Sequence, residues 1–251
     1  MEIGSFIELQ FSKGKEFYHQ LTDIARLNTG RAAIWHAFRV TGCKAIWIPY
    51  YQCETVREML LKYGAEVKYY HINNNLNPVD LNPEDNEAVL FVNYYGVMSH
   101  NRMVDLASKS KNSIIDNCQA FFNAPIADAM NVYSCRKFVG VPDGAYVIGK
   151  DAHIFVGEYS QCYSSDTAAF LLMRIEYGCE GKSYEARSMN ERRIDAEPIM
   201  KMSKLTRTIL DGTDYEFIKR RRRENFRFAH DLFGNINKIN PLKYYDEDTI
   251  P

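Results

Sequence analysis

The chain has 251 residues and a formal net charge of −1; 46% of its residues are hydrophobic and 25% are charged. This balance is that of an ordinary globular protein. It excludes a disordered or collagen-like chain, a disulfide-rich miniprotein and an overall basic nucleic-acid-binding protein. The length predicts one large domain, or one domain and part of another.

Signals for membranes, export and metals are weak. The longest apolar runs, such as residues 88–92, are far shorter than the roughly 20 residues that span a bilayer. The start, Met-Glu-Ile-Gly-Ser-Phe, lacks the basic and continuously apolar pattern of a secretory signal, so we expect a cytoplasmic protein without membrane partners. The six cysteines form no Cys-x-x-Cys pair and have no histidine at metal-ligand spacing, which predicts reduced thiols and no metal site.

Short β-rich runs alternate with helical patterns over residues 44–135, and one more such run follows at 145–148. The run at 88–93 is almost wholly apolar, as in a strand that is buried on both faces of a parallel sheet. Helical periodicity appears at 54–63 and at 102–109. This alternation predicts an α/β fold with a mostly parallel, doubly wound sheet. The expected strands are 44–48, 66–72, 88–93, 113–116, 132–134 and 145–148.

After about residue 160 the pattern becomes helix-rich, with helices expected at 167–177, 200–210 and 215–233. We therefore expect a large domain over residues 1–180, followed by a helical segment over 181–251 that leads into a smaller C-terminal domain. The final Asp-Thr-Ile-Pro251 has the pattern of the start of another extended segment, so this second domain is expected to be incomplete.

Residues 28–34 predict the start of a helix with a phosphate-binding character. Gly30 permits a tight turn, and the small residues after Arg31 leave N–H groups open at the positive end of the helix dipole. An ordinary N-cap formed by Thr29 explains the same residues without any ligand.

Asp116 ends an apolar strand, and open α/β sheets bind ligands at the carboxyl ends of their strands. A carboxylate there can pair with a protonated ring nitrogen, and Gln119 is close enough in sequence to reach the same ligand. The alternative is that Asp116 only caps the following turn.

Lys137 follows a short strand, with the hydroxyl of Ser134 three residues earlier and a glycine-bearing turn, Gly140 to Gly144, just after. This pattern suits a lysine that forms a Schiff base beside a hydroxyl that binds phosphate. Most lysines are merely solvated, so Lys137 alone does not decide between the two interpretations.

Taken in chain order, these residues resemble the fold-type I pyridoxal-phosphate enzymes, and in particular the DegT/DnrJ/EryC1/StrS family of aminotransferases, many of which act on nucleotide-linked keto sugars. The similarity covers most of residues 24–150. The matching segments are Thr29-Gly-Arg-Ala-Ala-Ile, Trp47-Ile-Pro-Tyr-Tyr, Phe91-Val-Asn-Tyr-Tyr-Gly96, Ile115-Asp116-Asn-Cys-Gln119-Ala and Pro142-Asp-Gly-Ala.

The resemblance implies pyridoxal 5'-phosphate as the cofactor and assigns a role to each matching residue. Lys137 would form the Schiff base, Asp116 would hold the pyridine nitrogen, and Gln119 would lie against the ring. The phosphate would be bound by Ser134 and by the backbone near Gly30 and Arg31, with Thr29 as a further hydroxyl. Tyr51 follows a strand end and is a candidate to cover the ring, although ordinary packing explains it equally well.

The sequence departs from the family pattern at three places. Arg31 stands where the family usually has a hydroxyl residue, and a guanidinium can either bind phosphate or face solvent. The spacing from Ser134 to Lys137 is shorter than usual for the family. The family's partner-subunit asparagine has no clear counterpart, and Asn190 is the candidate.

The leading interpretation is an aminotransferase that moves an amino group from an amino-acid donor to a keto substrate, with a nucleotide-linked keto sugar as one such acceptor. A pyridoxal-phosphate-dependent dehydratase or lyase fits the same cofactor contacts, and a degenerate, non-catalytic binding or regulatory protein also fits. A homodimer is expected, because enzymes that resemble this chain complete each site with residues of a second subunit. The run Arg220 to Arg223 is interpreted as a solvated helix rather than a nucleic-acid site.

Overall fold

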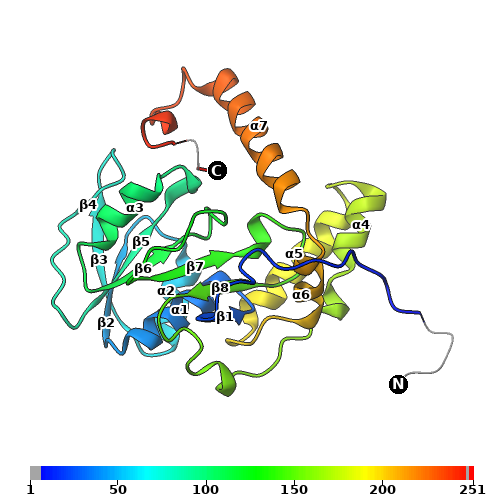
Figure 1. Cartoon of the computed structure of the whole chain (residues 1–251), viewed down its shortest axis with the longest axis horizontal. Helices are drawn as coiled ribbons and strands as arrows, with labels where there is room; N and C mark the ends of the chain where they lie inside the picture. The colour runs from blue at the N-terminus through cyan, green and yellow to red at the C-terminus, as the bar shows by residue number, and fades with distance from the viewer. Residues whose placement is uncertain (1–6, 247–248) are drawn as a thin grey trace.

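A computed structural model describes residues 7–246 and 249–251 and contains an eight-stranded sheet (Figure 1). The strand order is β1-β8-β7-β6-β5-β2-β3-β4. Each of the neighbouring pairs from β7 through β3 is parallel, whereas β8 is antiparallel to both β7 and β1, and β4 is antiparallel to β3. The predicted α/β fold with a mostly parallel sheet is confirmed. The strands are β1 (Ile24–Leu27), β2 (Ala45–Pro49), β3 (Glu66–Ile72), β4 (Pro78–Val79), β5 (Ala88–Val92), β6 (Asn112–Asp116), β7 (Met130–Ser134) and β8 (Ala145–Ile148).

All six predicted strands are present, with ends that differ from the prediction by two residues at most. Two further strands, β1 and β4, were not predicted. β1 is only four residues long and contains Arg26, so it has no continuous apolar run; the guanidinium of Arg26 pairs with the buried carboxylate of Glu16. β4 has two residues and carries no periodic signal.

Seven α-helices are described, and α7 has the predicted bounds. The helix α5 was missed because its sequence is polar almost all round and buries only Ser183, Asn190 and Ile194. The predicted helix at 200–210 begins four residues later, after the Ser203 N-cap, because residues 200–202 instead pair with β1 and its flanks. The helices are α1 (Gly30–Thr41), α2 (Glu54–Lys62), α3 (His100–Ala107), α4 (Ala169–Tyr177), α5 (Lys182–Ala196), α6 (Lys204–Asp211) and α7 (Tyr215–Phe233), with short 3-10 turns at Tyr94–Gly96, Cys135–Lys137, Val156–Glu158, Ser165–Thr167 and Pro241–Lys243.

Helices cover both faces of the sheet, as the alternation along β5 shows. Leu90 packs in the core with α1 and α2, whereas its neighbours Val89 and Phe91 point to the opposite face, where they pack with Met103 and Leu106 of α3. Because successive strand residues face opposite sides, an apolar strand of this kind needs cover on both sides. The sheet is therefore doubly wound.

The division at residue 180 remains a prediction. Residues from both sides of it share core clusters: Ile199 packs with the α1 face of the sheet, and Met202, Leu210 and Tyr215 pack with aromatic residues from before residue 150. Buried apolar surface therefore joins the helical segment α6–α7 to the sheet.

Among the described residues, no helix is long and apolar enough to cross a membrane, and no cluster of His, Cys, Asp and Glu is arranged to hold a metal ion. The first six residues, from which we inferred the lack of a secretory signal, lie outside the described part of the chain. Asp248, in the predicted final extended segment, lies outside it as well.

Candidate functional site

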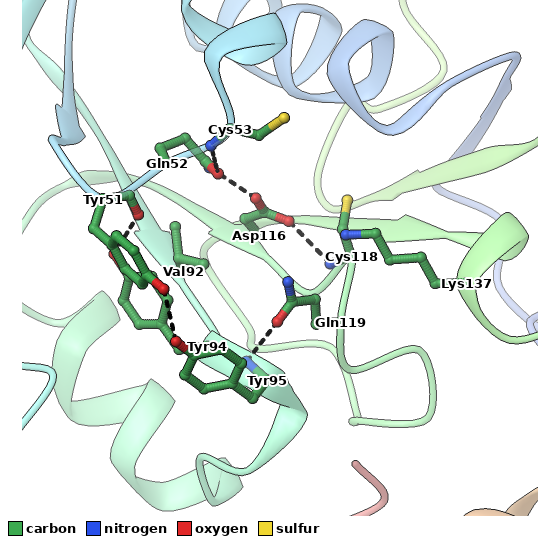
Figure 2. A pocket seen from close by; sticks show the side chains of 10 residues that line it. All are labelled: Tyr51, Gln52, Cys53, Val92, Tyr94, Tyr95, Asp116, Cys118, Gln119 and Lys137. Carbon is green, nitrogen blue, oxygen red and sulfur yellow. Dashed lines mark hydrogen bonds between the residues drawn. The ribbon is translucent and has the colours of Figure 1, made fainter. Parts of the chain in front are cut away.

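A cavity of about 260 Å³ opens at the carboxyl ends of four adjacent parallel strands, β7, β6, β5 and β2 (Figure 2). This is the edge at which open α/β sheets bind ligands. Four predicted site residues, Tyr51, Asp116, Gln119 and Lys137, meet there. We call it the Asp116 cavity; its lining also includes Gln52, Cys53, Val92, Tyr94, Tyr95 and Cys118.

Asp116 is the last residue of β6 and is only 5% exposed. Its Oδ1 accepts a hydrogen bond from the backbone N–H of Cys118 at 2.9 Å, and its Oδ2 accepts one from the side-chain amide of Gln52, also at 2.9 Å. The Gln52 amide is itself oriented, because its Oε1 accepts from the N–H of Cys53 at 2.8 Å. A buried carboxylate is thus held by two donors in a fixed direction, and part of its charge is compensated.

Gln52 was not predicted. It follows Pro49, the last residue of β2, in the same way that Gln119 follows β6. The rule that singled out Asp116, a polar residue just past the carboxyl end of a buried strand, therefore also applies to Gln52.

Cys118 separates Asp116 from the start of α1. Its thiol is buried, and this burial, together with the nearby Asp116 carboxylate, raises the pKa of Cys118 well above that of an ordinary thiol. A Cβ added at Gly30 would lie 2.8 Å from the Cys118 Sγ and 3.7 Å from the Ser134 Cβ. Gly30 is therefore required for the close approach of α1 to the two chain segments that follow β6 and β7.

Thr29 is the N-cap of α1, which is the alternative weighed for it from the sequence. Its hydroxyl accepts from the N–H of Ala32 at 3.1 Å, and its carbonyl accepts from that of Ala33 at 2.9 Å. The N–H groups of Gly30 and Arg31 lie ahead of these two bonds, at the positive end of the helix. They are the backbone groups of α1 that suit an anion.

Arg31 is turned away from the Asp116 cavity. Its guanidinium forms an ion pair with Asp195 at 2.8 Å and donates to the carbonyl of Ile194, both on α5. In this arrangement the side chain of Arg31 ties α1 to α5. Thr29, Gly30, Arg31 and Ser134 lie beside the cavity and do not line it.

Lys137 ends the 3-10 turn that follows β7, and its side chain is exposed toward the cavity. None of the ion pairs among the described residues includes Lys137. Ser134 is buried at the end of β7 and lines a second, larger groove that Lys137 also lines. Lys137 therefore stands between two hollows.

Gln119 is held by the loop after β5. Its Oε1 accepts from the backbone N–H of Tyr95 at 2.6 Å, and Tyr95 adopts a left-handed φ of 58°. Gly96 follows with φ 68°, and a Cβ there would lie 2.0 Å from the Gln119 carbonyl oxygen. A non-glycine residue in this conformation stores backbone strain, and such strain is concentrated where a site must be held in place.

Three tyrosines form the rim of the cavity. The hydroxyls of Tyr51 and Tyr95 are 2.8 Å apart, and the hydroxyl of Tyr94 donates to the Tyr51 carbonyl at 3.0 Å. The hydrogen bond with Tyr51 and partial burial raise the pKa of Tyr95 to about 12. The Tyr95 hydroxyl is therefore uncharged at neutral pH, and the rim offers aromatic faces to a ligand.

Asn190, the candidate for a partner-subunit contact, is buried in its own chain. Its amide donates to the carbonyl of Pro142 at 3.0 Å, and its oxygen accepts from Arg193 at 3.4 Å. These contacts assign Asn190 to the support of the turn after Lys137.

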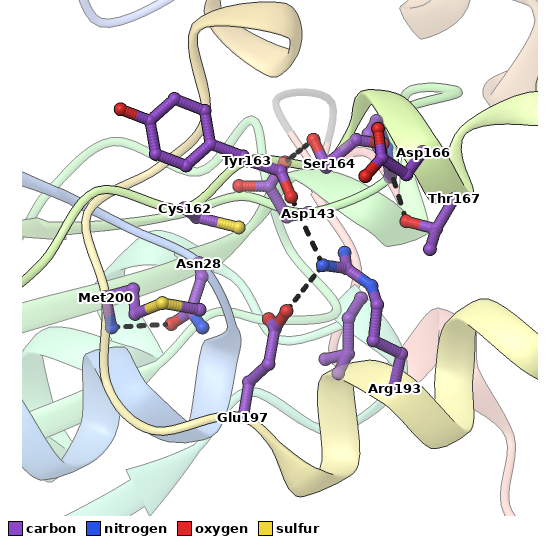
Figure 3. A network of polar contacts seen from close by, with 12 residues as sticks. Asn28, Asp143, Cys162, Tyr163, Ser164, Asp166, Thr167, Arg193, Glu197 and Met200 are labelled. Carbon is purple, nitrogen blue, oxygen red and sulfur yellow. Dashed lines mark hydrogen bonds and ion pairs between the residues drawn. The ribbon is translucent and has the colours of Figure 1, made fainter.

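A network of polar contacts fixes that same turn (Figure 3). The carboxylate of Asp143 is fully buried and accepts from the hydroxyl of Ser164 at 3.0 Å, from the hydroxyl and N–H of Ser203 at 2.6 and 2.8 Å, and from the hydroxyl of Thr206. Ser203 is also the N-cap of α6. The network therefore joins the turn to the beginning of α6.

The next residue, Gly144, joins this turn to α1. Its φ is 119°, and its N–H donates to the carbonyl of Asn28 at 2.7 Å. The side-chain oxygen of Asn28 in turn accepts from the N–H of Met200 (Figure 3). Its amide donates to the carbonyl of Pro198. The loop after Lys137 and the residue just before the Thr29 cap are thus held in one frame.

Comparison with family models and with curated proteins finds no match. Comparison with solved structures finds aminotransferases. The sugar aminotransferase CalS13 from Micromonospora echinospora is 16% identical with a TM-score of 0.56, over 86% of this chain and 62% of that one. The putative sugar aminotransferase Spr1654 from Streptococcus pneumoniae, in its PMP form, is 12% identical with a TM-score of 0.56, over 86% and 60%. NtdA from Bacillus subtilis with bound PMP is 15% identical with a TM-score of 0.53, over 84% and 49%.

These similarities concern the fold. The chain has the fold of the fold-type I aminotransferases. It spans about half to three fifths of the length of these three structures.

Proposed function

We propose that the chain is an aminotransferase of the DegT/DnrJ/EryC1/StrS family that binds pyridoxal 5'-phosphate and transfers an amino group from an amino-acid donor to a keto acceptor. One observation carries the proposal: Asp116, Gln119 and Lys137, brought from two different strand ends, line one cavity at the ligand-binding edge of an aminotransferase fold. Nucleotide-linked keto sugars are the acceptors that the sequence resemblance implies, and they are tested against other acceptors below.

The residues present fit such a cofactor. A buried carboxylate suits a protonated ring nitrogen, the uncapped N–H groups of Gly30 and Arg31 suit a phosphate, and an unpaired lysine faces the same cavity. When bound, the cofactor supplies an electron sink for the carbanion that forms when the donor loses its Cα proton.

The chain's own groups supply the rest of the mechanism. Lys137 would hold the cofactor through Nζ, and the same amine would serve as the base and acid that moves the proton lost from the Cα of the donor. Asp116 would keep the proton on the ring nitrogen, because its carboxylate is itself fixed by Gln52 and the Cys118 N–H. Gln119 would lie beside the ring, and its side chain is held in place by the hydrogen bond from the Tyr95 N–H.

Two measurements test the proposal. Borohydride reduction of the cofactor-loaded protein, followed by peptide mapping, should leave the label on Lys137; a label on Lys150, or none while cofactor is bound, contradicts it. Addition of glutamate or aspartate should convert the bound cofactor to its amine form and abolish its visible absorbance. A protein that binds the cofactor without this conversion is a lyase or a non-catalytic relative.

We also propose that the protein is a homodimer. Two of the rim tyrosines are partly exposed at the cavity mouth, Tyr51 by 57% and Tyr95 by 50%, whereas Tyr94 is buried, so a second subunit would bury aromatic surface beside the site. Light scattering should give twice the chain mass. A stable monomer that transaminates at a normal rate contradicts a shared site.

A further inference from the structure

A second hollow of about 1130 Å³ begins at Lys137, the residue that it shares with the Asp116 cavity. Four segments form it: Leu9 and Phe11 of the N-terminal segment before β1, the loop after β7, the hairpin of α4 and α5, and α6. Figure 1 shows this hairpin beyond the β1 end of the sheet. We call it the α4 groove. Its size is more than four times that of the cavity, so it holds a molecule larger than the one that fits around Asp116.

The walls of the α4 groove are mostly apolar. They carry side chains from the Lys137 loop and from α4, and much of this apolar surface is open, with Leu172 59% and Ile175 82% exposed. The apolar lining residues are Leu9, Phe11, Phe138, Val139, Val141, Ala168, Ala169, Phe170, Leu171, Leu172, Ile175, Leu205 and Ile209.

The charged residues of the groove are unbalanced. Four cations, Arg136, Lys137, Arg174 and Arg187, face one carboxylate, Glu191. Glu191 pairs with Arg136 and lies 3.9 Å from the Nε of Arg187. Arg174 and Lys137 take part in none of the ion pairs found among the described residues. The surplus positive charge in an apolar hollow favours an anion.

The lining also lacks the groups that recognise sugars and bases. Among the described residues that line the groove there is no Asn, Gln, Asp, Thr or His, and the polar uncharged side chains are three serines, one tyrosine and one cysteine. A hydroxyl-rich ligand would lose its hydrogen bonds with water on entering and would find few replacements. An apolar body loses little on entering, and one acidic group would exchange its water for the surplus arginines of the groove.

We propose that the α4 groove is the acceptor site and that the acceptor is a keto acid with an apolar aryl or alkyl body, not a nucleotide-linked sugar. The apolar body packs on Leu171, Leu172 and the loop after Lys137, the acid group is held by Arg174 and Arg187, and the keto carbon reaches the Asp116 cavity at Lys137. The assignment of this ligand as the acceptor of the reaction rests on the proposed function. The binding of an apolar acid in the groove does not depend on it.

Binding is measured with two fluorescent probes that share one ring system: 8-anilinonaphthalene-1-sulfonate, which carries an acid group, and N-phenyl-1-naphthylamine, which does not. We expect one sulfonate site per chain. The double substitution Arg174→Glu/Arg187→Glu should weaken the sulfonate probe about tenfold and leave the neutral probe within about twofold, since a charge-assisted contact is worth roughly this factor. The double substitution Arg220→Glu/Arg227→Glu, which makes the same charge change on α7 outside the groove, should change neither.

Competition then identifies the ligand class. Phenylpyruvate should displace the sulfonate probe, and UDP should not. Displacement by UDP and not by phenylpyruvate overturns the proposal in favour of a nucleotide. If the charge reversal weakens both probes equally, the arginines do not recognise the acid group and the proposal is overturned. If the sulfonate probe binds only when a dimer dissociates, the groove is covered by a second copy of the chain and the proposal is overturned as well.

The link to Lys137 is tested by acetylation. Saturating sulfonate probe should slow the acetylation of Lys137 severalfold and leave the exposed Lys150 unchanged, as measured by peptide mass. These tests need no cofactor, so their outcome is independent of the proposed function. If the glutamate half-reaction is normal but the probe does not slow the acetylation of Lys137, only the assignment of the groove is overturned. Protection of Lys137 in a protein that never transaminates overturns only the proposed function.

Discussion

The Asp116 cavity and the α4 groove meet at Lys137 but differ in almost every other property. In the cavity, the polar groups are paired with each other: Asp116 with Gln52 and the Cys118 N–H, and Gln119 with the Tyr95 N–H. In the groove, the walls are mostly apolar, and Arg174 takes part in none of the ion pairs among the described residues. Polar groups that are already paired are preorganised for one ligand. An open apolar surface with a surplus of positive charge instead accepts any ligand that combines an apolar body with a negative charge.

This difference predicts how substitutions should act. Changes in the cavity should affect both halves of the reaction, because both use the same cofactor. Changes in the groove should affect only the half-reaction with the acceptor, raising KM more than they lower kcat. The following predictions test the cavity side of this comparison.

The largest effect is expected for Lys137, the residue that belongs to both regions. Lys137→Ala should lower the rate of the glutamate half-reaction by about 10²–10⁴-fold, because it removes the group that moves the proton. Lys137→Arg, which keeps the positive charge, should be equally impaired. A Lys137→Arg variant with near-normal turnover would show that the residue acts only by its charge.

Asp116→Asn should come next, with cofactor still bound and the rate reduced by about 10²-fold or more. A neutral amide cannot stabilise a protonated ring nitrogen by charge. The measurement is the half-reaction rate together with the absorbance of the bound cofactor. Near-normal turnover in this variant returns Asp116 to the role of a turn cap.

Gln52 should have a smaller, positioning effect of about tenfold, because it acts through Asp116. Gln52→Leu removes the donor to Oδ2, whereas Gln52→His keeps a donor at similar reach and should recover part of the loss. A shift in the pH profile of the half-reaction, with little change in the apparent affinity for glutamate, distinguishes positioning from lost folding. Identical profiles for both variants and the parent protein contradict this role.

The two cysteines of the cavity should respond differently to alkylation. Burial and the Asp116 carboxylate raise the pKa of Cys118, so its thiol stays protonated and unreactive at pH 8.5, whereas the thiol of Cys53 is exposed to the reagent. Iodoacetamide followed by peptide mass should therefore label Cys53 severalfold faster. Equal labelling means that the region between Asp116 and α1 opens in solution.

The sequence predicted the sheet well because its buried strands are apolar on both faces. The run Ala88–Val92 is apolar at every position, which fits only a strand that is buried on both faces. β1 contains Arg26, and its burial can be recognised only once the ion pair of Arg26 with Glu16 is known. The helix α5 was missed for a related reason, since it buries only three residues and is held by contacts such as Arg31 to Asp195.

The site was predicted in part. Asp116, Gln119 and Lys137 carry a local signal, namely a polar residue near the end of an apolar strand, and they do line one cavity. The orientation of Arg31 toward α5 depends on a residue more than 160 positions away, and the groove depends on four segments brought together only by folding. Side-chain direction and hollow shape are tertiary properties that local spacing does not encode.

The smallest predicted effect concerns the contact that brings α1 to the cavity. Gly30→Ala places a Cβ 2.8 Å from the Cys118 Sγ, and overpacking of this kind costs about 1–3 kcal/mol in the free energy of unfolding. Cys118→Ala removes the sulfur, so Gly30→Ala should cost much less in that background, and a double-mutant cycle by urea denaturation measures the difference. If the two costs simply add, the contact does not set the position of α1. If the double variant regains its stability but not its affinity for the cofactor, the backbone of Gly30 also binds the phosphate. A methyl group at Gly30 would then obstruct the anion even after the clash with the Cys118 sulfur is relieved.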